Sequence, residues 1–204
     1  MQHGLNTIET RQVKHIHYGT GSPYMDLKLR RGGALELVID PEPNLNMLCA
    51  ALETLHGRDL ATLSFAPEAG LVPSGQGGFQ FQYAPKPALV VAGRGAILRT
   101  TASLAASMGF ELHLASPDED DITSLAGLRP KSTHRMTTPN VPLKLPIDAH
   151  TAVLLLFHDH EWEHTLLINT VSVQPFFMGA LGRRKTQEIR LQRLLEAGLD
   201  LKLC

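Results

Sequence analysis

The sequence is poor in cysteine, in surplus charge and in long apolar segments. Its 204 residues include 2 cysteines, Cys49 and the terminal Cys204, which are too few for a disulfide framework. Because 19 basic residues stand against 20 acidic ones, the basic surplus that binds nucleic-acid phosphates is missing, and we expect no nucleic-acid partner. The longest apolar run, 152–157, falls far short of the roughly 20 residues of a membrane-spanning helix. Since a secretory signal is also missing, we expect a cytoplasmic protein with no membrane partner.

The first 84 residues show the pattern of a small domain of mixed α+β structure. Alternating apolar positions predict strands at 13–18, 25–29, 35–39, 61–65 and 79–83. A helix is expected to follow Asn44, a residue that favours helix N-caps, and to end before Gly57. Cys49 lies on the apolar face of this helix, so we expect it in the core.

A Pro-rich break at 84–87 precedes a different pattern, which predicts a second domain over residues 85–204. Short continuous apolar runs alternate there with helical periodicity, as in βαβ units around a buried parallel sheet. The sequence therefore predicts an α/β protein, with a small N-terminal domain followed by a Rossmann-like parallel-sheet domain. In the last helix, 183–197, the residues expected to face the sheet are Ile189, Leu191, Leu194 and Leu195.

The first turn of the second domain, Gly93-Arg94-Gly95, joins a buried strand to a helix N-terminus, where free N–H groups attract phosphate. The dinucleotide fingerprint is incomplete, because Leu98 holds its third glycine position. Ser116 stands where a ribose-binding acid closes the second strand of such folds. Two interpretations follow: the turn binds a nucleotide, or the glycines only form a tight turn.

His158-Asp159-His160 directly follows the apolar run 152–157 and should lie at the carboxyl edge of the sheet. Ligands bind at that edge in open α/β sheets, and three titratable residues in a row are not needed there for packing. The alternative is that these residues only cap the next helix.

The segment 160–164 also contains the pattern H-E-x-x-H, formed by His160, Glu161 and His164. On a helix the two histidines could share a zinc ion while Glu161 acts as the general base of a peptidase. No later histidine supplies a third ligand, and Glu188 lies beyond another predicted strand.

The segment 179–186, which contains Gly179 and Gly182, carries Arg183, Arg184 and Lys185 to the start of the last helix. Cations oppose the helix dipole at that position, so an anion should compensate them. One candidate is a phosphate-bearing ligand, which suits the fork geometry of arginine. The other candidate is the acidic run Asp118–Asp121 of the same chain.

In their order along the chain, the segments 31–37, 92–95, 157–161 and 179–186 resemble the XdhC/CoxI family. Members of this family are accessory proteins of xanthine dehydrogenase and related molybdenum hydroxylases. The resemblance implies an XdhC domain followed by a Rossmann domain, in a homodimer that is a chaperone and not an enzyme. It also implies that the protein binds molybdenum cofactor, protects it while a sulfurtransferase exchanges an oxygen for sulfur, and delivers it to a xanthine dehydrogenase-type enzyme.

Motifs and resemblance together predict a cofactor site with no catalytic residue and no metal ligand. Its predicted residues are Arg31, Gly32, Gly33, Gly93, Arg94, Gly95, Ser116, His158, Asp159, His160, Gly179, Gly182, Arg184 and Lys185. Family members commonly have Cys-Gly-Gly where this chain has Arg31-Gly32-Gly33, so a thiol that could contact molybdenum is replaced. The chain could then hold the cofactor by its phosphate end, or it could have lost cofactor handling. The remaining alternatives are an NAD(P)-dependent oxidoreductase and the zinc peptidase.

Overall fold

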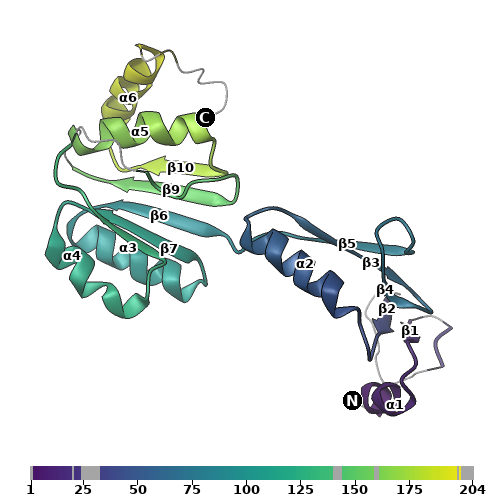
Figure 1. The fold of residues 1–204 in the computed structure, drawn as a ribbon. Helices are drawn as coiled ribbons and strands as arrows, with labels where there is room; N and C mark the ends of the chain where they lie inside the picture. Colours follow the sequence, from purple (N-terminus) through teal and green to yellow (C-terminus); the bar gives the residue numbers. More distant parts are fainter. Residues whose placement is uncertain are drawn as a thin grey trace. The chain divides into compact units, whose positions relative to one another are not determined.

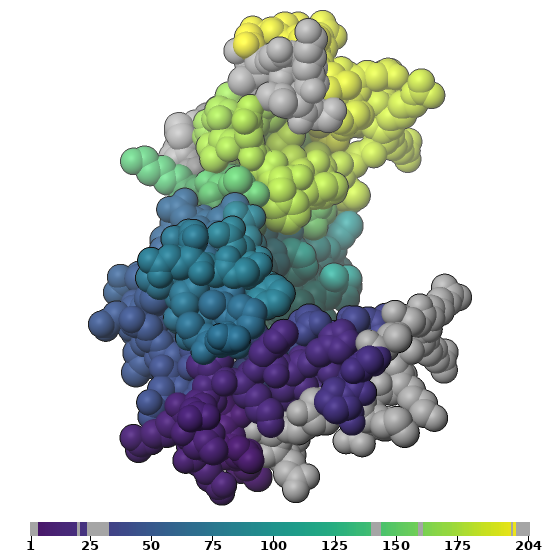
Figure 2. All heavy atoms as spheres, turned by 90° about the vertical axis from the view of Figure 1, so that its right-hand side faces the viewer, coloured from purple at the N-terminus to yellow at the C-terminus, as the bar shows by residue number. Residues whose placement is uncertain are grey.

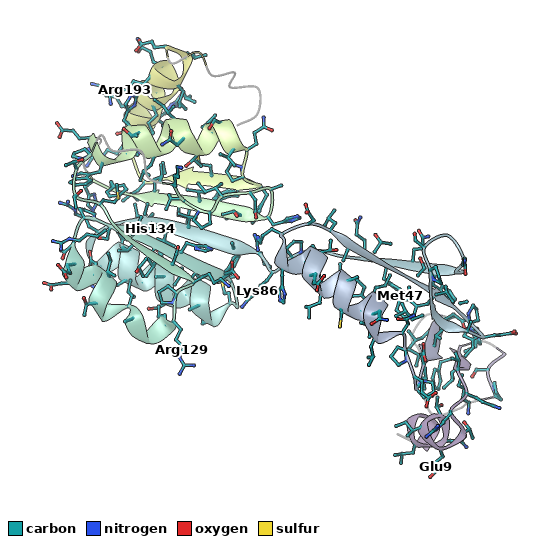
Figure 3. The ribbon with its side chains drawn as sticks, in the orientation of Figure 1. Glu9, Met47, Lys86, Arg129, His134 and Arg193 are labelled. Atoms are coloured by element: carbon teal, nitrogen blue, oxygen red, sulfur yellow. The ribbon has the colours of Figure 1, made fainter. Side chains whose placement is uncertain are left out.

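The computed structural model describes residues 2–19, 21–23, 33–139, 144–158, 161–196 and 198. The chain divides into two units, Met1–Pro85 and Lys86–Cys204 (Figure 1). Lys86, which begins the second unit, is labelled in Figure 3. Among the described residues, no helix combines the length and the apolar composition that a membrane crossing requires.

The first unit contains two helices and two small antiparallel sheets. Strands β1 (Lys14–Tyr18) and β2 (Leu35–Ile39) pair with each other, and β3 (Ala61–Ala66) lies between β4 (Gly70–Val72) and β5 (Phe79–Tyr83). The helices are α1 (Gln2–Thr10) and α2 (Leu45–His56). This mixed structure agrees with the predicted fold class, although α1 and β4 were not predicted. The strand predicted at 25–29 lies outside the described residues.

Helix α2 begins as the sequence predicts, but its buried side is different. The side-chain oxygen of Asn44 accepts hydrogen bonds from the amides of Asn46 and Met47 at 3.1 and 3.2 Å. The helix contacts β3 and has no fully buried residue. Cys49 is exposed, so its predicted place in the core is wrong. The physical reason is that a small sheet covers only one narrow side of the helix.

Apolar side chains also reach the surface of this unit. Phe81 and Tyr83 on β5 are 53% and 44% exposed, and Leu52 on α2 is 51% exposed. In the view of Figure 2, the blue atoms of the β3–β5 sheet and the purple atoms of α1 and β1 lie on the face turned to the viewer. The unit therefore lacks a thick apolar core of its own.

The second unit is built on a five-stranded parallel sheet in the order β10-β9-β6-β7-β8. Its strands are β6 (Ala88–Gly93), β7 (Glu111–Ser116), β8 (Ser132–Arg135), β9 (Thr151–Leu156) and β10 (Phe177–Ala180). Its helices are α3 (Gly95–Ser107), α4 (Glu119–Ser124), the short 3-10 helix Ala126–Leu128, α5 (Glu161–Val173) and α6 (Arg184–Glu196). This is the predicted Rossmann-like parallel sheet, with one polar edge strand, β8, that was not predicted.

Helices cover both faces of this sheet (Figure 1). Helix α3 packs on one face through Leu98, Ala102 and Ala105, whose small side chains let the helix lie close to the strands. Helices α5 and α6 pack on the other face, through Leu166 and Leu194 among others. Because β6 and β9 are covered on both sides, their sequences are almost continuously apolar.

Candidate functional site

Three of the sequence motifs meet at one edge of the parallel sheet. The motifs follow the carboxyl ends of β6, β9 and β10, at Gly93–Gly95, at His158 and at Leu181–Arg183. Between β6 and β9 the strand order reverses, because β7 lies on one side of β6 and β9 on the other. Open α/β sheets bind their ligands at such a reversal, so this edge is the candidate site.

The two glycines of the first turn serve different structural purposes. A Cβ atom on Gly93 would lie 2.7 Å from the carbonyl oxygen of Leu156, so this glycine lets β6 and β9 pack closely. Gly95, the first residue of α3, has a φ of +74°, a conformation that other residues adopt only with strain. The turn therefore needs both glycines for its own geometry.

A buried carboxylate accepts a hydrogen bond from the backbone amide at the start of α3. Asp121 of α4 is 1% exposed and accepts a hydrogen bond from the Gly95 amide at 2.6 Å. It also forms an ion pair with Arg99, one turn further along α3. Because this amide and the helix dipole already have a negative partner, a dinucleotide phosphate at the same place would be repelled. The arrangement disfavours the NAD(P)-dependent alternative.

Arg94, between the two glycines, lies over an aromatic ring. Its guanidinium carbon is 5.8 Å from the ring centre of Trp162, a half-buried residue in the first turn of α5. Arg94 itself is exposed and forms no ion pair among the described residues. The sequence analysis did not identify Trp162, since nothing in the local pattern links it to a turn 68 positions earlier. The pair spans the reversal between β6 and β9 with one cation and one planar ring.

Arg94 also borders a shallow hollow of about 350 Å³. This hollow is lined by Arg94, Arg135 and the residues 117–120, where Glu119 forms an ion pair with Arg135. Ser116, which precedes these residues, is 0% exposed, and its hydroxyl accepts a hydrogen bond from the Asp118 amide at 3.1 Å. Ser116 thus fixes the turn after β7, and its role in cofactor binding stays a prediction.

The β10–α6 segment presents its three cations to solvent. Arg183 precedes α6, and Arg184 and Lys185 are the first two residues of the helix. The side chain of Arg184 is 96% exposed and lies 3.5 Å from Glu188 on the next turn. The alternative that Asp118–Asp121 compensates these cations is wrong for the described contacts, since Asp121 pairs with Arg99 and Glu119 with Arg135. All three side chains are exposed, so an external anion can reach them.

The inner side of α6 differs from the predicted one. Ile189 and Leu195 are 43% and 59% exposed, whereas Arg190 is only 5% exposed. Arg190 forms an ion pair with Glu163 of α5, which is 2% exposed. Apolar periodicity could not reveal this arrangement, because it treats both residues as polar and therefore external. This buried pair lies directly behind the cationic segment.

The other predicted residues are placed only in part. His158 is exposed at the end of β9, and Gly33 is exposed just before β2. Arg31, Gly32, Asp159 and His160 lie outside the described residues. Gly179 lies within β10, and a Cβ on it would be 3.0 Å from Leu154.

The described residues contain only part of the proposed zinc pattern. Helix α5 begins at Glu161, and no group of three His, Cys, Asp or Glu residues in the described part of the chain could hold a metal ion. Glu163, inside the pattern, faces Arg190 instead of solvent. His160, the first residue of the pattern, lies outside the described residues, so the hypothesis stays untested there.

Comparison with known proteins gives a consistent assignment. Residues 89–203 match the family model described as the XdhC Rossmann domain. The chain is 31% identical over 203 residues to the molybdenum cofactor insertion chaperone PaoD of Escherichia coli K12. That alignment covers 95% of this chain but only 57% of the relative's length.

A solved structure supports the same fold. The crystal structure of a xanthine dehydrogenase from Bacillus halodurans superposes with a TM-score of 0.71 at 15% identity, covering 94% of this chain and 68% of that chain. At this identity the match supports the fold alone. The family model spans more than half of the chain and covers nearly all of the parallel-sheet unit. The chain therefore belongs to the XdhC family, and its second unit is an XdhC Rossmann domain.

Proposed function

We propose that this chain is a chaperone that binds molybdenum cofactor at the carboxyl edge of its parallel sheet. The observation that carries the proposal is the Arg94–Trp162 pair at the strand-order reversal of an XdhC Rossmann domain, with exposed cations after the neighbouring edge strand β10. The cofactor combines a planar pterin with a phosphate, so it needs a stacking surface and positive charge. The chain is 31% identical to a molybdenum cofactor insertion chaperone, which supports the same ligand.

The cations after β10 suit the phosphate end of the ligand. Arg183 directly precedes α6, and Arg184 and Lys185 are its first residues, next to the free backbone amides of a helix N-terminus, which attract phosphate. Because Asp121 already uses the Gly95 amide at the start of α3, the phosphate belongs at α6 and not at α3. Arg183 therefore joins the predicted residues Arg184 and Lys185.

Arg94 and Trp162 suit the ring end of the ligand. Guanidinium and indole planes both stack on flat heterocycles, and the two side chains already lie one over the other. His158, which is exposed and follows β9, would face the pterin or the metal end. These residues bind and orient the cofactor without reacting with it, so the proposal includes no catalytic residue.

We extend the proposal to the partners. A carrier that releases its cargo needs a recipient, and we propose a molybdoenzyme of the xanthine dehydrogenase type. A sulfurtransferase would act on the bound cofactor before its delivery, and the carrier would work as a cytoplasmic homodimer. The resemblance to XdhC proteins supports these partners, and the chain spans only 57% of the length of the relative named above.

The test is the pterin and molybdenum content of protein purified without oxygen from a host that makes the cofactor. We expect both to co-purify with the wild-type chain. The variants Arg184→Ala and His158→Ala should each retain less pterin, by about tenfold where one charge-assisted hydrogen bond is lost.

Arg193→Ala is the matched control. Arg193 lies in the last turn of the same helix, away from the cationic segment (Figure 3). Full retention is expected in this variant. Retention that is unchanged in both Arg184→Ala and His158→Ala would overturn the site. A wild-type protein without pterin would overturn the function.

A further inference from the structure

Arg190 uses its whole guanidinium to join three parts of the second unit. Nε and Nη2 donate to the two carboxylate oxygens of Glu163, and the Nη2–Oε2 distance is 2.7 Å. Nη2 also donates to the carbonyl of Leu181, and Nη1 donates to the carbonyl of Ala180 at 3.5 Å and to Gln187 at 3.3 Å. A guanidinium has five N–H groups, and the five bonds match that number. Helix α5, helix α6 and the segment after β10 are thus tied at one point.

The segment after β10 is shaped around this guanidinium. A Cβ atom on Gly182 would lie 2.9 Å from Nη1 of Arg190 and 2.9 Å from the methyl group of Thr186. Glycine is therefore the residue that lets the backbone pass this close to the guanidinium. The next residues along the chain are the cations Arg183, Arg184 and Lys185.

The same contact also reaches the aromatic side of the candidate site. Glu163 follows Trp162 in the first turn of α5, so the ion pair anchors the turn that carries the ring beneath Arg94. On a helix, neighbouring residues point in directions about 100° apart. Trp162 thus faces the carboxyl edge while Glu163 faces α6.

Stability alone does not require charged residues at this position. Apolar residues of similar volume commonly replace a buried ion pair without loss of stability, whereas removal of one partner is strongly destabilising. An apolar pair would fill the same space but could not hold the carbonyls of Ala180 and Leu181. What the charged pair adds is a fixed backbone after β10.

We infer that Arg190 and Glu163 are positioning residues that hold the Arg183–Lys185 cations and the Arg94–Trp162 stack in one arrangement for the ligand. The inference rests on the proposed function for the identity of that ligand. The two residues are buried and act through the segments that they fix. Loss of the pair should therefore weaken ligand binding without unfolding the protein.

The test is the double variant Glu163→Leu/Arg190→Met in the full chain, with three measurements. We expect a melting temperature close to that of the wild type. The backbone ¹⁵N order parameters of Leu181, Gly182 and Arg183 should fall from about 0.85 to below about 0.6. Co-purified pterin should fall by about tenfold or more, as is usual when residues that support a binding site are lost.

Two further variants keep the test valid if the double variant does not fold. Arg190→Lys keeps the charge but loses the fork, so it should loosen the same three residues. Leu194→Ala removes a buried side chain from the same helix without touching the ion pair. It should lower the melting temperature but leave the order parameters and the pterin content unchanged.

The outcomes separate this inference from the proposed function. Unchanged order parameters at Leu181–Arg183 in both Arg190 variants would overturn the positioning role, whatever the pterin content. A loosened segment with full pterin retention would overturn both the role in ligand binding and the assigned site. A loosened segment in a protein whose wild type carries no pterin would support the positioning and overturn the proposed function.

Discussion

Asp121 on α4 accepts a hydrogen bond of 2.6 Å from the amide of Gly95, the first residue of α3. In a Rossmann-like domain this amide lies where the phosphates of a dinucleotide bind. Here the anion at that position is a side chain of the protein itself, and Arg99 pairs with it. The first turn is thus satisfied internally, and the proposed ligand site lies instead at the reversal between β6 and β9 and at the start of α6.

The bond between Asp121 and Gly95 predicts the effect of Asp121→Asn. The amide side chain keeps the shape but removes the charge that faces the helix dipole and Arg99. We expect the free energy of unfolding to fall by about 2 kcal/mol, the usual contribution of a hydrogen bond to a charged group. Urea denaturation at neutral pH measures this change.

Asp120→Asn is the control for that experiment. Asp120 is the exposed neighbour of Asp121 in α4, so its replacement should change stability by less than about 0.5 kcal/mol. Equal losses in the two variants would show that the charge of α4, and not the Gly95 contact, is responsible.

The internal anion also predicts that the wild-type protein does not bind NAD or NADP. A dinucleotide phosphate at α3 would meet the Asp121 carboxylate at a short distance, and like charges repel strongly where water is scarce. We expect no heat in a calorimetric titration with either nucleotide at millimolar concentration. Heat with a defined stoichiometry would contradict the assignment of Asp121 and restore the oxidoreductase alternative.

The close approach of Gly182 to Arg190 predicts the effect of Gly182→Ala. The added methyl group would meet Nη1 of Arg190 and the methyl group of Thr186, and the guanidinium cannot move without loss of its bonds to Glu163. We expect a loss of about 1–3 kcal/mol in the free energy of unfolding, as for other overpacked sites. Gly127→Ala is the control, because a Cβ there has open space. A loss of similar size in the control would remove the contact as the cause.

In the first unit, Glu36 predicts a dependence of stability on pH. Glu36 and His17 are partners across β1 and β2, and Glu36 also lies 2.7 Å from His15. The hydrogen bond from His17 is the main cause that lowers the pKa of Glu36 below its usual 4.5. Neighbouring charge and the bond from His15 act in the same direction, and desolvation opposes them.

The sign of this effect follows from the lowered pKa. Ionised Glu36 stabilises the folded state fully above the unfolded pKa of 4.5, and this contribution is lost as the pH falls through the lower pKa of the folded state. The stability difference between wild type and Glu36→Gln should therefore be present at about pH 5.5 and shrink as the pH falls below 4.5. Unfolding by urea at a series of pH values measures it, with Glu53→Gln on exposed α2 as the control. A difference that grows toward low pH would contradict the assignment.

The sequence predicts most of the second unit because its strands are covered on both faces. β6 and β9 are nearly continuous apolar runs that are easily recognised. The edge strand β8, with the sequence Ser-Thr-His-Arg, has no such run and was missed. β4 was missed for another reason: it is three residues long and lies in a Pro/Gly-rich segment. Short and polar strands depend on their neighbours, which a local pattern does not contain.

The candidate site was predicted where its residues are consecutive and missed where they come together only in the fold. Gly93–Gly95 and Arg183–Lys185 are continuous motifs next to strand ends, so their place at the sheet edge follows from the order of elements. Arg190 and Glu163 are 27 positions apart, and each by itself resembles a surface residue. The same applies to Trp162 and Arg94. Pairs that form across the fold leave no periodic signal in the sequence.

The stack of Arg94 on Trp162 gives the most direct optical test of the site. Trp162 is the single tryptophan of the chain, so its fluorescence reports on this place alone. In Arg94→Ala one face of the ring loses its cover, and we expect a red shift of the emission and stronger quenching by acrylamide. The free energy of unfolding should fall by about 0.5–1 kcal/mol, the usual contribution of an exposed cation–π pair. Arg193→Ala removes an exposed arginine elsewhere on the domain and should leave the emission unchanged. Identical spectra for Arg94→Ala and the wild type would contradict the stack, and with it the surface to which the pterin ring is assigned.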